Sequence, residues 1–371
     1  MRIGVPTEIK VHEYRVALTP AGAHALTGAG HDVVIQSGAG AGSSLSDDEY
    51  RAAGATVVPD AASVWDAADL VCKVKEPLAS EYPHLRPGLL LFTYLHSAAD
   101  LPGTRAILDA RVTAVAYETV TAPDGTLPLL APMSEIAGRL AAQVGAVELM
   151  RPRGAGVLMG GVPGVPPVRV VVLGAGTVGR NAVQVALGMR ADVCVVDVSA
   201  AALRAIDVEH AGHVRTAASN AWEIEPLIEQ ADLVVGAVLI PGARAPHLIS
   251  DELVSRMRPG SVLVDVAIDQ GGCSAVSRPT THDAPTYRVH GTTVYAVANM
   301  PGAVPVTATR ALTNATLPYL LELADVGHAL TEPERDQPAP RRAALRTGLR
   351  AGLVAADGRL LNEAVAAAHG L

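Results

Sequence analysis

The sequence predicts an α/β protein made of two doubly wound parallel-sheet domains, one of them inserted into the other. Short runs of β-branched residues alternate with Ala-rich helical stretches, which is the pattern of βαβ units. The chain has 371 residues, more than one hydrophobic core normally organises. The alternation stops at a segment rich in Gly and Pro, residues 151–167, and then resumes, which indicates two such domains.

The first third of the chain is expected to supply the strands of one sheet. These strands are predicted at residues 2–5, 32–36, 70–74, 89–95 and 112–116. A helix is predicted at 19–30, with Thr19 as its N-cap and Pro20 in its first turn. A second helix is predicted at 134–150, with Ser134 as its N-cap.

The second sheet is expected to begin directly after the loop at 151–167. Buried parallel strands are predicted at residues 168–173, 192–198, 232–238, 262–268 and 293–298. The chain then becomes helical at 306–324, and a polar, Pro-containing stretch at 332–342 precedes a final Ala-rich helix. We therefore expect residues 130–306 to form a central domain, inserted in a domain made of residues 1–129 and 307–371.

Composition excludes several classes of partner and location. The formal net charge is −8 and the Lys and Arg residues are scattered, which disfavours nucleic acid or an anionic membrane surface as a partner. Aromatic residues make up only 3%, so platforms for stacking single-stranded nucleic acid are missing. Cys72, Cys194 and Cys273 lie far apart, as in a protein of a reducing compartment. With neither a signal peptide nor a long apolar stretch, a cytoplasmic protein is expected.

A glycine-rich turn follows the first strand of the central domain. The predicted strand at 168–173 leads directly into Gly174, Gly176 and Gly179, spaced as GxGxxG, and then into a helix. These glycines permit a tight turn, an approach of the backbone to a pyrophosphate, and close packing of helix on strand. The next strand ends in Asp197, at the spacing of the acid that binds a ribose 2′-hydroxyl, with no Arg directly after it. This pattern predicts a Rossmann domain that binds NAD rather than NADP; a glycine-rich turn in a domain without nucleotide is the alternative.

Four polar residues stand where turns or strand ends would expose them. Arg15 follows a polar turn, and its planar fork suits a carboxylate. Lys75 ends an apolar strand, with Lys73 expected on the same face, and it could bind an oxygen. His96 ends another strand and could move protons. Asp269 lies past the carboxyl end of a central strand, where ligands bind in doubly wound sheets. Arg15, Lys75 and His96 also have structural interpretations, as a surface Arg, a charged strand end and a structural His.

Several longer strings of residues resemble bacterial alanine dehydrogenase, in the same order and over nearly the whole chain. They are GVPTEIK at 4–10, KVKEP at 73–77, YLH at 94–96, APMSEIAGR at 131–139, residues 265–273, SRPTT at 277–281 and ANMP at 298–301. The resemblance implies a discontinuous substrate domain with an inserted Rossmann domain, NAD as cofactor, and a homohexamer.

The resemblance also implies roles for individual residues. Arg15 and Lys75 would hold the substrate carboxylate and carbonyl oxygen, His96 and Asp269 would be the catalytic acid/base pair, and Met133 and Met300 would line a small apolar pocket. The residues implied in cofactor binding are Ser134, Gly174, Gly176, Thr177, Val178, Gly179, Asp197, Ser219, Leu239, Ile240, Ala267, Ile268, Asp269, Arg278, Ala298, Asn299, Met300 and Pro301.

Two positions depart from the pattern of relatives. Ala202 stands where some relatives have a Lys beside the adenosine ribose, which could adjust the affinity for NAD. Some relatives hold a metal near the last helix with Glu and His; here Glu322 is present, but Val326 stands at the position of the His, so no metal is expected.

The implied reaction is the oxidative deamination of L-alanine to pyruvate and ammonium, and its reverse. Three alternatives remain: the NAD(H)-binding component of a transhydrogenase, a dehydrogenase of the saccharopine type that acts on larger amino acids, and a catalytically silent NAD(H) sensor. The complete set of Arg15, Lys75, His96 and Asp269 favours an enzyme, and Met133 with Met300 favours a small substrate. Formation of NADH from NAD⁺ and a panel of amino acids would discriminate among them.

Overall fold

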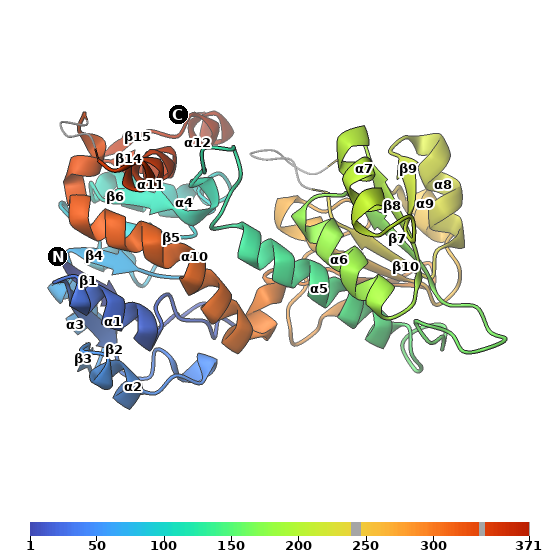
Figure 1. Ribbon diagram of the computed structural model, residues 1–371, viewed down its shortest axis with the longest axis horizontal. Coiled ribbons are helices and arrows are strands. Elements are labelled where there is room, and N and C mark those ends of the chain that lie inside the picture. The colour runs from blue at the N-terminus through green and yellow to red at the C-terminus, as the bar shows by residue number, and fades with distance from the viewer. Residues whose placement is uncertain (239–245, 334–337, 371) are drawn as a thin grey trace. The chain divides into compact units, whose positions relative to one another are not determined.

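The computed structural model (Figure 1) describes residues 1–238, 246–333 and 338–370. The chain divides into two compact units, one made of residues 1–133 and 302–371 and the other of residues 134–301. Each unit has its own sheet. Among the described residues, no helix combines the length and the apolar character that a membrane span requires.

The first unit is built on an eight-stranded sheet with the order β15-β14-β6-β5-β4-β1-β2-β3. Its six parallel strands follow the doubly wound order, which reverses between β1 and β4, and β14 and β15 add an antiparallel edge. The strands are β1 (Arg2–Val5), β2 (Asp32–Gln36), β3 (Thr56–Val58), β4 (Leu70–Cys72), β5 (Leu90–Thr93), β6 (Thr113–Ala116), β14 (Leu353–Ala356) and β15 (Arg359–Leu360).

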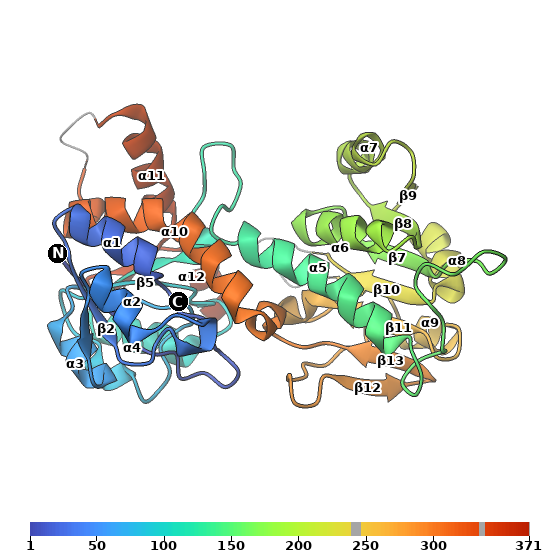
Figure 2. The ribbon, with the colours of Figure 1, turned by 60° about the horizontal axis from the view of Figure 1, so that its bottom comes forward.

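Helices cover both faces of this sheet. Figure 2 shows α1, α10 and α11 on one side and α3 and α4 on the other. Trp65 of α3 and Ile107 of α4 are buried against inward-facing residues of β4, β5 and β6. The helices are α1 (Pro20–Gly28), α2 (Asp47–Ala52), α3 (Ala61–Ala67), α4 (Leu101–Asp109), α10 (Pro305–Val326), α11 (Pro340–Ala351) and α12 (Glu363–His369), with short 3₁₀ helices η1 (Ala41–Ser43), η2 (Tyr82–His84), η3 (Tyr117–Thr119) and η6 (Gly327–Thr331).

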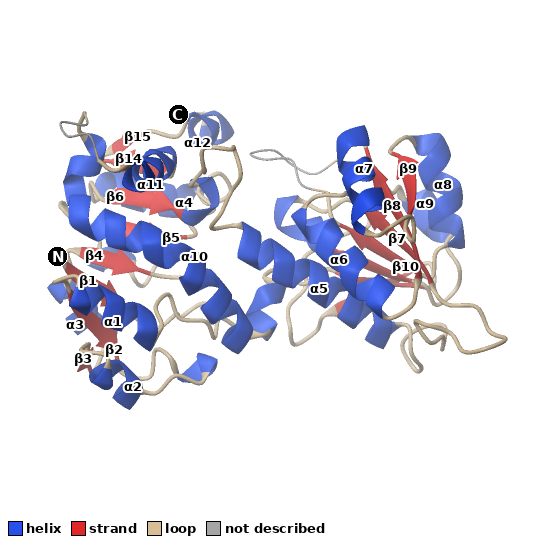
Figure 3. Cartoon of the chain, viewed as in Figure 1, coloured by secondary structure: helices blue, strands red, loops and turns tan. Residues whose placement is uncertain are grey.

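The second unit has a seven-stranded sheet with the order β12-β13-β11-β10-β7-β8-β9. Figure 3 labels four of its neighbouring strands, β10, β7, β8 and β9. Six strands are parallel in the Rossmann order, and β12 pairs antiparallel with β13 at one edge. The strands are β7 (Arg169–Leu173), β8 (Asp192–Asp197), β9 (Arg215–Ala218), β10 (Leu233–Gly236), β11 (Val262–Asp265), β12 (Thr286–Val289) and β13 (Thr292–Tyr295). The helices are α5 (Ala131–Glu148), α6 (Thr177–Gly188), α7 (Ala200–Glu209), α8 (Ala221–Gln230) and α9 (Asp251–Ser255), with η4 (Val266–Gln270) and η5 (Met300–Ala303).

Both faces of the second sheet are buried, as its continuous Val-rich strands predict. Val170 and Val172 of β7 face a core that includes residues of α5, α6 and α7. Val171 and Leu173 of the same strand face a core that includes residues of α8 and α9. The predicted fold class is therefore confirmed, with the addition of an antiparallel edge on each sheet.

Three local predictions were wrong, each for a local reason. Ser134 is not an N-cap, because α5 already begins at Ala131, and Pro132 is tolerated in a first helical turn. The strand predicted at 262–268 ends at Asp265, whose side chain accepts a hydrogen bond from the Ala267 N–H and starts a 3₁₀ turn. The final helix predicted after residue 342 is instead α11, the β14–β15 hairpin and α12, with Asp357 and Gly358 at positive φ in the hairpin turn.

Candidate active site

The carboxyl ends of β4 and β5 bring two of the expected residues together in the first unit. The strands are parallel neighbours, with Cys72 paired to Phe92, so the residues that follow them lie side by side. Lys75 Nζ lies 3.5 Å from His96 Nε2. This edge is the one at which doubly wound sheets bind ligands, and β4 borders the point where the strand order reverses.

The backbone around His96 is held by an acid that the sequence analysis missed. His96 has a φ of +49°, a left-handed conformation that non-Gly residues adopt only with support. The Glu118 carboxylate accepts hydrogen bonds from the N–H groups of Leu95 (3.2 Å) and His96 (2.6 Å). The Tyr94 ring stacks near the imidazole, with ring centroids 6.0 Å apart. The available signal was that Glu118 is the second residue after the predicted strand at 112–116, which corresponds to β6, the neighbour of β5.

Lys73 and Lys75 have different surroundings, although both follow β4. Lys73 is buried, with its Nζ 2.9 Å from Glu81 and 3.3 Å from Glu8. Burial alone would lower the pKa of Lys73, but the two carboxylates outweigh it and raise the pKa. Lys73 is therefore part of a buried ion triad, whereas Lys75 is the lysine beside His96.

Arg15 is buried and held in place by its own loop. Its Nε donates to Glu13 Oε1 at 2.6 Å, and a second guanidinium nitrogen pairs with the other carboxylate oxygen of Glu13. Its Nη1 lies 3.0 Å from the Met133 sulfur, so these two expected substrate residues are in contact. Burial opposes the charge of Arg15, but the bonds to Glu13 outweigh it and raise the pKa. Arg15 and Glu13 also line a cavity of about 290 Å³.

The glycine turn of the second unit has the geometry that nucleotide binding requires. Gly174 has a φ of +106°, and a Cβ there would lie 2.6 Å from the Ala237 carbonyl oxygen. A Cβ on Gly179 would collide with the carbonyl oxygen of Gly174. Gly176 is the N-cap of α6 without a side-chain cap, and the space beside its Cα is open. The N–H groups of the first turn of α6, which holds Thr177 and Val178, thus face an accessible site for an anion.

Asp197 joins this turn to the neighbouring strand end. Its carboxylate accepts hydrogen bonds from the N–H groups of Ala175 and Ser199, both at 2.7 Å. The Ser219 N–H donates to the Asp197 carbonyl oxygen at 3.0 Å, which places Ser219 at the same edge. Ser134 lies one helical turn before Gly138, where α5 approaches the Val178 carbonyl oxygen so closely that a Cβ would collide.

Asp269 lies on the 3₁₀ turn η4, together with Ala267 and Ile268, and its side chain is exposed. Buried Asp265 organises this turn: it accepts hydrogen bonds from the N–H of Cys273 (2.9 Å) and the hydroxyl of Ser277 (2.5 Å). Burial raises the pKa of Asp265, although these bonds oppose the shift.

The remaining expected cofactor residues also belong to the second unit. Arg278 is exposed and lies 4.2 Å above the Tyr287 ring. Asn299 has a φ of +65° and lies with Ala298 and Pro301 in the turn that contains Met300. The Met300 side chain is buried in the core of this unit. Leu239 and Ile240 lie outside the described residues.

The expected residues thus divide between the two units. In the first unit, Lys75 lies beside His96 and Arg15 contacts Met133. The second unit holds the glycine turn, the residues placed around it and Asp269.

Glu322 is engaged by two guanidinium groups. Its carboxylate oxygens lie 2.6 Å from the Nε atoms of Arg342 and Arg346, and Arg342 also pairs with Asp325. Glu322 thereby fastens α11 to α10. Within the described ranges, His, Cys, Asp and Glu side chains form no group of three that could hold a metal ion.

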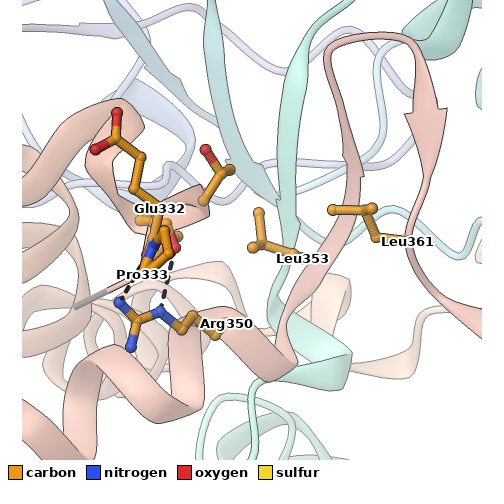
Figure 4. Close-up of a pocket in the computed structure, with 7 residues that line it drawn as sticks. Glu332, Pro333, Arg350, Leu353 and Leu361 are labelled. Carbon is orange, nitrogen blue, oxygen red and sulfur yellow. Dashed lines mark hydrogen bonds between the residues drawn. The ribbon is translucent and has the colours of Figure 1, made fainter.

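A larger cavity of about 450 Å³ lies elsewhere in the first unit (Figure 4). It is lined mainly by Leu353, Leu361, Pro333 and Arg350 and contains none of the expected site residues. Arg350 donates from Nε to the Leu330 carbonyl oxygen and from Nη2 to that of Glu332. These bonds hold the guanidinium against the backbone of residues 330–332.

Comparison with known proteins gives concordant matches. Family models described as the N-terminal and C-terminal domains of "Alanine dehydrogenase/PNT" match residues 4–137 and 141–362. An alanine dehydrogenase of Mycobacterium tuberculosis is 57% identical over 367 residues, which cover 99% of this chain and 96% of that protein. The solved structure of an L-alanine dehydrogenase matches with a TM-score of 0.93 and 47% identity, covering 100% of this chain and 99% of that one. A transhydrogenase from Sinorhizobium meliloti matches with a TM-score of 0.79 and 25% identity, covering 98% and 99%.

Proposed function

Because the chain belongs to the alanine dehydrogenase/PNT family, we propose that it is an NAD-dependent enzyme that converts L-alanine to pyruvate and ammonium, and catalyses the reverse reductive amination. The balanced reaction is L-alanine + NAD⁺ + H₂O ⇌ pyruvate + NH₄⁺ + NADH + H⁺. The observation that carries the proposal is the pair of Lys75 and His96 at the ligand-binding edge of the first sheet. Full-length identity of 57% to an alanine dehydrogenase supports the choice of substrate.

The first unit supplies the groups that bind the substrate. Arg15 holds the carboxylate, because Glu13 fixes the orientation of the guanidinium and so preorganises it for an anion. Met133, in contact with Arg15, supplies an apolar surface for the methyl group. Lys75 places its positive charge near the oxygen that becomes bonded to the α-carbon. This cation stabilises the negative charge that develops on that oxygen.

The second unit supplies the site for NAD. Gly174, Gly176 and the first turn of α6 fit a pyrophosphate, and Asp197 fits a ribose 2′-hydroxyl. When bound, NAD⁺ accepts the hydride from the α-carbon of the substrate. The protein then has to deliver water to the resulting iminium carbon. His96 and Asp269 are the groups proposed to move protons to and from that water and from the leaving ammonia.

The activity is tested by following NADH absorbance after mixing the protein, NAD⁺ and L-alanine. We expect NADH to form with L-alanine and much more slowly with L-lysine, because Met133 leaves a small apolar site. Glycine and L-serine, and glyoxylate with ammonium in the reverse direction, define the range of substrates. If no substrate of this panel changed the absorbance while NADH still bound, a transhydrogenase-like or sensor role would replace the proposal.

The role of Asp197 predicts the cofactor preference. Asp197→Asn should weaken NAD⁺ binding by about tenfold or more and weaken NADP⁺ binding less, since a charge-assisted hydrogen bond contributes roughly 1.5–3 kcal/mol and the repulsion of a 2′-phosphate is lost. Dissociation constants for both cofactors measure this effect. Asp192→Asn, at the opposite end of the same strand, is the matched control and should change neither constant. If the ratio of the dissociation constants of NAD⁺ and NADP⁺ were unchanged in Asp197→Asn, the proposed binding of the ribose 2′-hydroxyl by Asp197 would be wrong.

We also propose that the enzyme acts as a cytoplasmic homohexamer. The resemblance to alanine dehydrogenases supports the assembly. The free, buried state of Cys72, Cys194 and Cys273 is consistent with a reducing compartment.

A further inference from the structure

We infer that Ser43 and Thr309 are positioning residues for Arg15 and thereby set the affinity for the substrate carboxylate. The inference rests on the proposed role of Arg15. Ser43 and Thr309 are 266 residues apart in the chain, and their hydroxyl oxygens lie 2.7 Å from each other in the interior of the first unit. We call them the hydroxyl pair.

The loop that contains Arg15 needs such support because it belongs to no helix or strand. Residues 6–19 lie between β1 and α1 without a ladder of backbone hydrogen bonds. Buried backbone groups in such a segment must find other partners. Arg15 and Val16 are 2% and 1% exposed, so the backbone of this part of the loop runs through the interior.

The hydroxyl pair supplies these partners on both sides of Arg15. Ser43 Oγ donates toward the carbonyl oxygen of Tyr14 at 3.1 Å, immediately before Arg15. Thr309 Oγ1 accepts a hydrogen bond from the N–H of Val16 at 3.1 Å, immediately after Arg15. The turn of η1 approaches this loop so closely that a Cβ on Gly42 would lie 2.6 Å from the Tyr14 carbonyl oxygen. The backbone of Arg15 is therefore anchored at both flanking peptides.

The side chain of Arg15 is fixed separately by Glu13. The Glu13 carboxylate accepts hydrogen bonds from the Arg15 backbone N–H (3.1 Å) and from its Nε (2.6 Å). Glu13 thus orients the guanidinium relative to its own backbone, while the hydroxyl pair places that backbone relative to η1 and α10. Because Ser43 and Thr309 are 1% and 0% exposed, they act through Arg15 rather than by touching the substrate.

Thr309→Val tests the inference, because valine keeps the shape of threonine but removes the acceptor of the Val16 N–H. The expected result is a rise of about fivefold in KM for L-alanine and for pyruvate, as for the loss of one neutral hydrogen bond. We expect kcat and the dissociation constant of NADH to stay within about twofold, and Thr309→Ser to restore the KM.

Thr316→Val is the matched control, because Thr316 is equally buried on α10 and its hydroxyl bonds Thr313 O on the same helix. It should leave KM unchanged. Equal KM values in Thr309→Val and Thr316→Val would overturn the inference, as would a parallel loss of kcat and NADH affinity. Ser43→Ala, which removes the other hydroxyl, should raise KM in the same way, and it decides the question if Thr309→Val does not fold.

A double-mutant cycle separates this inference from the proposed function. If Arg15→Lys raises KM strongly, Thr309→Val should add little in that background, because both changes act on one interaction. Full additivity would overturn the inference while the role of Arg15 stands. If Arg15→Lys itself left KM unchanged, the proposed role of Arg15 would fail instead.

Discussion

Lys75→Ala is expected to lower kcat/KM for L-alanine by about a thousandfold, because loss of one group that stabilises developing charge at an oxygen costs roughly 10²–10³ in rate. Lys75 is 9% exposed and its Nζ lies 3.5 Å from His96, so its charge acts in a partly dehydrated environment. Initial rates at saturating NAD⁺ measure the effect. His96→Ala should lower the rate by roughly 10²–10⁴, the range for general acid–base catalysis.

The two changes should not add. If Lys75 and His96 act in one step, the double variant should be scarcely slower than the slower single variant. Lys75→Arg is the control for charge alone: it keeps the cation but replaces a compact ammonium by a planar fork, and most of the loss should remain. Near wild-type turnover in Lys75→Ala would contradict a catalytic role of Lys75.

The sequence was sufficient to predict those parts of the fold whose structure depends on neighbouring residues in the chain. The predicted bounds of β1 and β2 coincide with those observed, and Thr19 caps α1 through a bond to the Gly22 N–H. The glycine turn could be predicted equally well, because it is formed by a strand, a turn and a helix in one continuous segment. The conformation of Gly174 and the close approach of Gly179 to the Gly174 carbonyl oxygen both depend on this segment alone.

The role of a residue could not be predicted from the sequence where its partners lie far away in the chain. Glu118 is recognisable only when β6 is known to lie beside β5, since its partners are backbone N–H groups 22 and 23 residues away. The contact between Ser43 and Thr309 joins residues on either side of the whole inserted unit. No periodicity or motif marks such pairs, because each hydroxyl alone is typical of a buried Ser or Thr.

Lys73 and Lys75 illustrate the same limit. The alternation of the strand predicts one face for both, and residue type alone gives either of them a catalytic or a structural role. The structure distinguishes them through Glu8 and Glu81, which surround Lys73 and come from other segments. Because both lysines follow the same strand, the same substitution at each of them compares a structural with a catalytic role.

Lys73→Met should destabilise the first unit by about 3–5 kcal/mol, the cost of removing one partner from a buried ion pair. The Lys73, Glu8 and Glu81 side chains are 1%, 3% and 7% exposed, so the two carboxylates would remain buried without their cation. Burial already raises the pKa of Glu8 despite the attraction of Lys73, which indicates how poorly this site tolerates a lone negative charge.

The effect can be assigned to the first unit by urea unfolding followed through tryptophan fluorescence. The chain has two Trp residues: Trp65 is fully buried in the first unit and Trp222 is 86% exposed in the second, so the change in the environment of Trp65 dominates the signal. Lys75→Met is the matched control and should shift the midpoint little while abolishing most turnover. Glu81→Gln in the Lys73→Met background should recover part of the stability, because it removes one of the two buried negative charges that no longer have Lys73 as a partner. Equal midpoints for Lys73→Met and Lys75→Met would contradict the division of roles, since the two lysines would then contribute equally to stability.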